Sequence, residues 1–145
     1  MELFDLTGKV ALITGSTKGI GKAIAERMAD AGAKVVISSR NQDACDEVAA
    51  EIKASGGEAL PIDCNINYKE QLQALVDKTL AHYGSIDILV INAALNPFYG
   101  KSQDIPDEAF DKIMSSNVGS AHRLCQMALP GMAANGGGAA IIVSS

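Results

Sequence analysis

The chain has 145 residues and a formal net charge of -5 at pH 7, and 48% of its residues are hydrophobic, 20% charged and 4% aromatic. A chain of this size can bury roughly 68–70% of its unfolded surface, so it can fold without disulfides or a structural metal. The acidic balance argues against nucleic acid as a partner, because nucleic-acid binding depends on an excess of basic charge.

The cysteine positions and the N-terminal residues argue against a zinc protein, a membrane protein and a secreted protein. Cys45, Cys64 and Cys125 lie far apart and show no zinc-type spacing, and no apolar run approaches the length of a membrane span. The first residues lack the basic and apolar regions of a signal peptide. We therefore expect a cytoplasmic protein that binds neither a metal nor a membrane.

An apolar run over residues 10–14 leads straight into a glycine-rich turn and then a helical pattern. The run predicts a strand that is buried on both faces. Glycines let an anion approach the main chain, and the N-terminus of a helix attracts phosphate. We therefore expect a pyrophosphate-binding site here. A turn without a ligand is the alternative reading. The expected contacts are Gly15, Ser16, Thr17, Lys18, Gly19, Ile20 and Gly21. The apolar stripe of the helix reads Ile20, Ile24, Met28 and Ala31.

The rest of the chain alternates strand and helix patterns. Strands are expected over 34–39, 59–64, 86–92 and 139–144, with one long helix over about 107–132. This alternation predicts an α/β protein with a doubly wound parallel sheet, in the strand order 3-2-1-4-5. Ligands bind where such an order reverses, so Gly15 and Asn92 should flank one crevice.

The end of the second strand bears on cofactor choice. An NAD site usually has a carboxylate there for the ribose, but Ser39 occupies that position and Arg40 follows it. A guanidinium can bind a phosphate through two hydrogen bonds, and Lys18 can approach the same group. We therefore expect NADP(H), although two solvated surface cations would give the same pattern.

Several motifs together resemble the short-chain dehydrogenase/reductase (SDR) family over the whole chain. The motif from Thr14 to Gly21, Thr-Gly-x-x-x-Gly-Ile-Gly, is similar to the family's cofactor turn. The resemblance implies a Rossmann-like domain over residues 1–145. It implies that Asn65 and Ile66 face the adenine, although Asn65 is nearly as well explained as a turn residue. It also implies that Asn92, Ala93 and Ala94 lie beside the ribose, where the family has Asn-Asn-Ala-Gly.

The same resemblance implies two catalytic residues, Ser145 at a strand tip and Asn117 within a helix. Ser145 would polarise a substrate carbonyl, and Asn117 would support a water in the proton relay. Asn117 interrupts an apolar stripe, which a helix kink also explains. The segment 96–100, Asn-Pro-Phe-Tyr-Gly, is similar to the family's NADPH-dependent carbonyl and retinal reductases.

The family's Tyr-x-x-x-Lys pair has no counterpart in the chain, since none of its three tyrosines has a lysine four residues on. The resemblance implies a complete form that reduces a carbonyl or oxidises an alcohol, and that forms a homo-oligomer. We expect the chain alone to have little reductase activity. A 3-oxoacyl carrier-protein reductase and a non-catalytic nucleotide-binding module are the alternatives.

Overall fold

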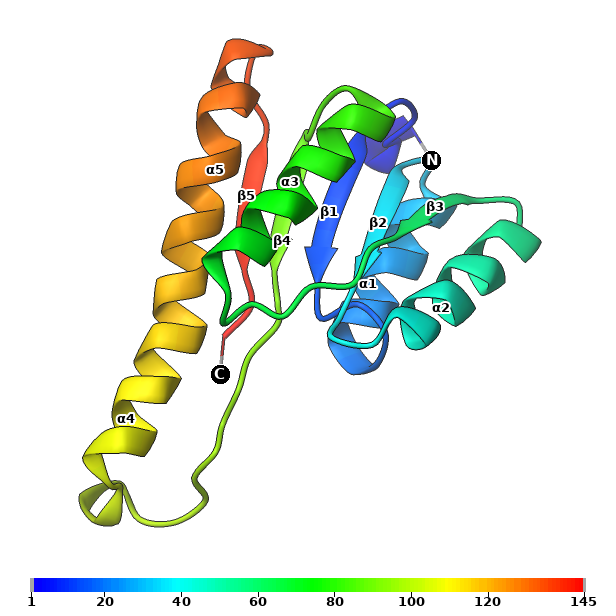
Figure 1. Ribbon diagram of the computed structural model, residues 1–145. Helices are drawn as coiled ribbons and strands as arrows, with labels where there is room; N and C mark the ends of the chain where they lie inside the picture. The colour runs from blue at the N-terminus through cyan, green and yellow to red at the C-terminus, as the bar shows by residue number, and fades with distance from the viewer. Residues whose placement is uncertain (1, 145) are drawn as a thin grey trace.

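The computed structural model describes residues 2–144, and its centre is a five-stranded parallel sheet. The strands lie in the order β3-β2-β1-β4-β5, which confirms the predicted doubly wound topology (Figure 1). Their bounds are β1 Val10–Thr14, β2 Lys34–Ser38, β3 Glu58–Pro61, β4 Ile88–Ile91 and β5 Ala139–Ile142. The first and fourth strands are neighbours, so the order reverses beside β1 as expected.

Helices cover both faces of the sheet (Figure 1). One face carries α1 Gly19–Asp30 and α2 Gln42–Ala54, and the other carries α3 Lys69–Tyr83 and α5 Ser120–Ala134. Ahead of α5 come α4 Asp107–Ile113 and a π-helical turn, Met114–Gly119. Short 3-10 turns occupy Glu2–Phe4 and Ser102–Asp104.

Two apolar clusters, one on each face, explain why the strands read as continuous apolar runs. Alternate residues of β1 divide between them: Ala11 and Ile13 pack under α1 and α2, whereas Leu12 packs under α3 and α5. All five residues of β1 are buried. A central parallel strand must be apolar on both sides for this reason.

The predicted stripe of α1 is confirmed in part, since Ile24 and Met28 pack at the margin of the core but the fully buried residues lie beside them. The buried residues of this helix are Gly21, Ala25 and Ala29, one position on from the stripe that begins at Ile20, and Ile20 is 65% exposed. A Cβ on Gly21 would lie 2.1 Å from the carbonyl oxygen of Gly15. The helix therefore approaches the sheet through its smallest residues, because larger side chains on that face would hold it away.

The long helix predicted over 107–132 is present as α4 and α5, joined by the π-helical turn that contains Asn117. Three apolar side chains along this element, Phe110, Met114 and Val118, are 43–56% exposed. Ile142 on the edge strand β5 is 61% exposed. One side of the molecule thus presents apolar side chains to solvent.

Candidate functional site

The glycine turn lies at the carboxyl end of β1, where the chain passes into α1. Gly15 and Gly19 have φ angles of 63° and 57°, in the left-handed region that favours glycine. A Cβ on Gly15 would lie 3.0 Å from the Cα of Ala93, so this glycine also lets the end of β4 pack closely. A Cβ on Gly19 would meet nothing within 4 Å. Gly19 is required for its backbone conformation, and Gly15 for conformation and space.

Among residues 2–144, no side chain caps the free N–H groups at the N-terminus of α1. Lys18 occupies the cap position, its side chain makes no cap hydrogen bond, and the first turn contains no acidic residue. The neighbouring α2 is capped conventionally, since Asn41 accepts a hydrogen bond from the N–H of Ala44 and Asp43 lies in its first turn. An uncapped helix N-terminus beside a glycine turn has the donors and the dipole that bind a phosphate group.

Ser16 joins this turn to β2. Its hydroxyl donates to the carbonyl oxygen of Ile13 at 2.8 Å and accepts from the N–H of Ser38 at 2.8 Å. The N–H of Ser16 donates to the carbonyl oxygen of Ser38 at 3.0 Å. Ser16 is fully buried, so its polar groups serve the sheet in this structure. Its expected role as a direct phosphate contact stays a prediction.

The Ser16–Ser38 contact brings two cations to the same edge of the sheet. Lys18 and Arg40 each lie two residues beyond this pair in the sequence, and both are exposed. Neither takes part in an ion pair among the residues from 2 to 144. Ser39 is half-buried, and its hydroxyl contacts the N–H of Asn41 and the Sγ of Cys45. Two unpaired cations therefore follow the glycine turn and the end of β2 within the described residues.

Thr14 and Asn92 join the carboxyl ends of β1 and β4. The Thr14 hydroxyl oxygen accepts hydrogen bonds from the N–H groups of Asn92 and Ala93, both at 3.0 Å. The side-chain amide of Asn92 donates to the carbonyl oxygen of Gly15 at 3.1 Å. Gly15 and Asn92 thus meet where the strand order reverses, and the crevice expected between them stays a prediction. Thr14 is a site residue that was not predicted, although it is the first residue of the glycine motif.

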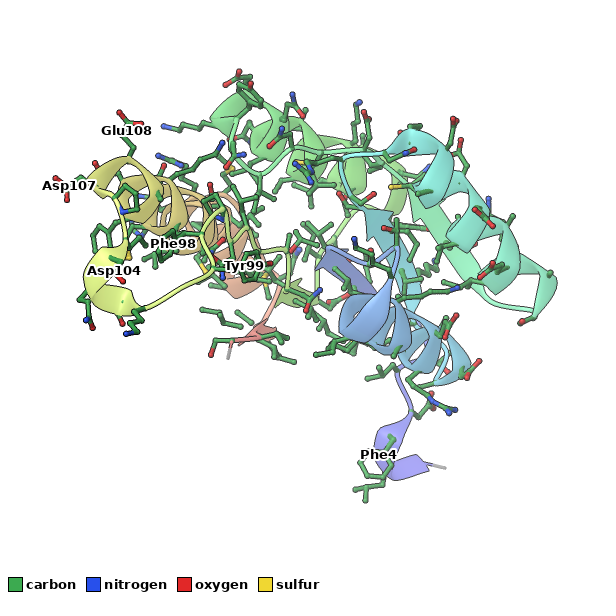
Figure 2. All side chains as sticks on the ribbon, turned by 90° about the horizontal axis from the view of Figure 1, so that it is seen from below. Phe4, Phe98, Tyr99, Asp104, Asp107 and Glu108 are labelled. Carbon is green, nitrogen blue, oxygen red and sulfur yellow. The ribbon has the colours of Figure 1, made fainter. Side chains whose placement is uncertain are left out.

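Asn117 holds the segment that follows β4. Its Oδ1 accepts from the N–H of Leu95 at 2.8 Å, and its Nδ2 donates to the carbonyl oxygen of Leu95 at 2.9 Å. Beyond Leu95, the N–H of Phe98 donates to the side chain of Asn96. Figure 2 views the molecule from below and labels Phe98 and Tyr99 on this segment. Tyr99 is 87% exposed.

Asn65 and Ile66 follow β3 on the far side of β2, and both are half-buried. The Oδ1 of Asn65 accepts from the N–H of Asn67 at 3.0 Å, which closes a local turn. The turn-residue reading of Asn65 is therefore present in the structure, and a contact with adenine stays a prediction. Ser145, the expected carbonyl-polarising residue, lies outside the described residues.

Tyr83 is partly buried in surroundings that do not suit proton transfer. Tyr83 ends α3 at the opposite edge of the sheet, where burial raises its pKa to about 12 with a further contribution from the charge of Glu58. Its ring lies 5.7 Å from the Nζ of Lys34, and its hydroxyl has no hydrogen-bond partner within the described part of the chain. A phenol in this state does not exchange protons near neutral pH.

Two surface hollows lie away from the expected crevice. One, of about 420 Å³, is bounded by β3 and α3, and the other, of about 480 Å³, lies between α1 and α2. Within residues 2–144, no three His, Cys, Asp or Glu side chains cluster as a metal site would require. Over the same residues, no helix combines the length and apolar character needed to cross a bilayer.

The parallel sheet, its reversal point and the glycine turn before an uncapped helix define a Rossmann-type nucleotide-binding protein. Residues 9–145 match the family model described as short chain dehydrogenase. The chain therefore belongs to the short-chain dehydrogenase/reductase family.

Relatives of known sequence and structure agree with this. The chain is 44% identical over 140 residues to dehydrogenase/reductase SDR family member 4 from Bos taurus, covering 97% of this chain and 50% of that protein. It is also 44% identical to the human "SDR family member 2, mitochondrial". The chain thus spans about half the length of these relatives.

Two solved structures are similar over nearly the whole chain. A 7α-hydroxysteroid dehydrogenase complexed with NADH and 7-oxo glycochenodeoxycholic acid superposes with a TM-score of 0.92 at 41% identity, covering 98% of this chain and 55% of that one. A metagenomic short-chain oxidoreductase in complex with NADP gives 0.90 at 34% identity, covering 97% and 63%. These relatives bind different nicotinamide cofactors, so the comparison supports such a cofactor without choosing between them.

Proposed function

We propose that this chain is the cofactor-binding part of an NADP(H)-dependent oxidoreductase that acts on a ketone or aldehyde, or on the matching alcohol. The observation that carries the proposal is the uncapped N-terminus of α1 with Lys18 and Arg40 beside it. Its free N–H groups fit a diphosphate, and the two cations fit the additional 2'-phosphate.

We propose that different parts of the expected crevice hold different parts of the cofactor. The glycine turn, with Thr17, Lys18 and Ile20, would hold the diphosphate, and Ser39 and Arg40 the 2'-phosphate. Asn92, Ala93 and Ala94 would lie beside the ribose, with Asn65 and Ile66 near the adenine. The bound cofactor supplies the hydride. Ser145 would polarise the substrate carbonyl, and Asn117 would support the proton relay through the segment that it holds.

Calorimetric titration of the protein with NADP⁺ and NAD⁺ tests the cofactor choice. We expect NADP⁺ to bind at least about tenfold more tightly, because one charge-assisted hydrogen bond contributes roughly 1.5–3 kcal/mol. Arg40→Ala should remove most of this preference, and Ser39→Asp should reverse it by placing a carboxylate near the ribose.

Arg27→Ala is the matched control. Arg27 is an exposed arginine on α1, paired with Asp30 at 3.7 Å and remote from the glycine turn. Its removal changes the net charge equally and should leave the NADP⁺ preference unaltered. Tighter binding of NAD⁺ by the wild type, or an equal loss in the Arg27 and Arg40 variants, would show that the assignment is wrong.

The complete protein's activity is a second part of the proposal. Because none of the tyrosines here has a lysine four residues on, we expect residues 1–145 to bind NADPH without oxidising it at an enzyme's rate in the presence of dicarbonyl substrates. The same observation keeps a non-catalytic nucleotide-binding module as the alternative. A 3-oxoacyl carrier-protein reductase would share these motifs, and a substrate panel on the longer protein separates them. We place the protein in the cytoplasm.

A further inference from the structure

The π-helical turn between α4 and α5 leaves one buried carbonyl without its usual partner. In an α-helix the N–H of Ser120 would bond the carbonyl oxygen of Ser116, four residues earlier. Here the N–H of Ser120 bonds the carbonyl oxygen of Ser115 instead, five residues earlier. Ser116 and Ser120 are 2% and 1% exposed, so water does not replace the missing donor.

The side chain of Ser120 supplies that donor. Its hydroxyl donates to the carbonyl oxygen of Ser116, so the wide turn has no orphaned acceptor at this point. Removing the hydroxyl would leave the Ser116 carbonyl unsatisfied, and the chain could satisfy it again by closing to an α-helical turn. Such a closure removes one residue from the turn, which rotates the neighbouring side chains by roughly 100°.

The hydroxyl of Ser116 connects the same turn to another segment of the chain. The hydroxyl of Ser116 donates to the Oδ1 of Asn67, in the loop that follows β3. Asn67 is itself held by Asn65, whose Oδ1 accepts from the N–H of Asn67. The turn is therefore connected to the loop expected near the adenine, and through Asn117 to Leu95 beside the expected crevice.

We propose that Ser120 and Ser116 are positioning residues, which hold Asn117 in the π-helical turn and thereby fix the Leu95 segment at the cofactor crevice. Both polar atoms of the Asn117 side-chain amide form hydrogen bonds with the backbone of Leu95, so a rotation of the turn breaks both bonds together. The consequence for catalysis rests on the proposed oxidoreductase function. The consequence for the Leu95 segment does not.

Amide hydrogen exchange at Leu95 tests the structural part, since the N–H of this residue is bonded to Asn117. The measured quantity is the ratio of the protection of Leu95 to that of the core residue Leu12, and the protection of Leu12 by itself reports any general loss of stability. We expect Ser120→Ala to lower this ratio about tenfold and Ser120→Thr, which keeps a hydroxyl, to preserve it. Ser115→Ala is the control, because Ser115 is an exposed serine of the same turn.

Asn67→Ala is a second variant that does not disturb the core, since Asn67 is exposed. It removes the acceptor of the Ser116 hydroxyl and should lower the Leu95 ratio by a smaller factor, about threefold. A ratio that stays at the wild-type value in both Ser120→Ala and Asn67→Ala overturns the proposal. So does an equal fall in Ser115→Ala.

Kinetics of the longer, active protein test the catalytic part. Ser120→Ala should lower kcat about tenfold, leave the KM for NADPH unchanged, and be rescued by Ser120→Thr. If kcat is unchanged although the protection of Leu95 relative to Leu12 has fallen, the catalytic role is refuted. A wild type that neither binds nor oxidises NADPH would instead refute the proposed function, and the exchange result would still decide the positioning role.

Discussion

Gly21→Ala is the most direct perturbation of the cofactor turn. The added Cβ would lie 2.1 Å from the carbonyl oxygen of Gly15 and 2.5 Å from the Nδ2 of Asn92, both far inside van der Waals contact. The helix α1 must then move away from β1 and β4, and the bond from Asn92 to Gly15 is strained or lost. Overpacking of this kind costs 1–3 kcal/mol and the hydrogen bond adds roughly 1, so we expect a total of about 3 kcal/mol.

This loss should lower the melting temperature by roughly 10 °C, and the displaced α1 N-terminus should weaken NADP(H) binding severely. Two other glycines separate the causes. Gly19→Ala meets nothing within 4 Å and should cost about 1 kcal/mol through its positive φ alone. Gly131→Ala, within α5, also meets nothing and should stabilise the protein by up to about 1 kcal/mol. A Gly21→Ala protein that melts and binds like the wild type would refute the close approach of α1.

Three further outcomes are expected. Thr14→Val removes the acceptor of two N–H groups and should lower the free energy of unfolding, measured in urea, by about 3 kcal/mol. Thr79→Val loses one hydrogen bond within α3 and should lower it by less than about 1 kcal/mol. Equal losses in the two variants would contradict the role of Thr14. Burial raises the pKa of Cys64 from 9.0 to about 11, so its contribution to stability is complete below pH 9 and is lost as pH rises toward 11. Cys64→Ala should flatten this alkaline decline in thermal melts, and an unchanged slope would count against it. Val118→Lys places a charge in the exposed apolar row that also contains Phe110 and Met114. It should reduce self-association in sedimentation experiments. The same oligomeric state in the wild type and the variant would show that this row takes no part in self-association.

The sequence by itself determined the topology and the place where the strand order reverses. Apolar runs such as 10–14 identify strands buried on both faces, and their alternation with helices leaves few arrangements for a parallel sheet. Glycines at 15, 19 and 21 mark the turn because few other residues tolerate its dihedral angles or its close contacts. These properties are local, so they can be read before the chain is folded.

Tertiary structure decided how the polar side chains are used. A serine after a glycine can bind a phosphate or a neighbouring strand, and only the assembled sheet directs Ser16 toward β2. A helical stripe predicts an apolar face, but close packing selected the smaller residues beside it, leaving Ile20 exposed. The π-helical turn likewise depends on groups far apart in sequence, since Asn117 contacts Leu95 and Ser116 contacts Asn67. Hydrogen bonds between distant segments exist only once the fold has brought them together, so no local pattern encodes them.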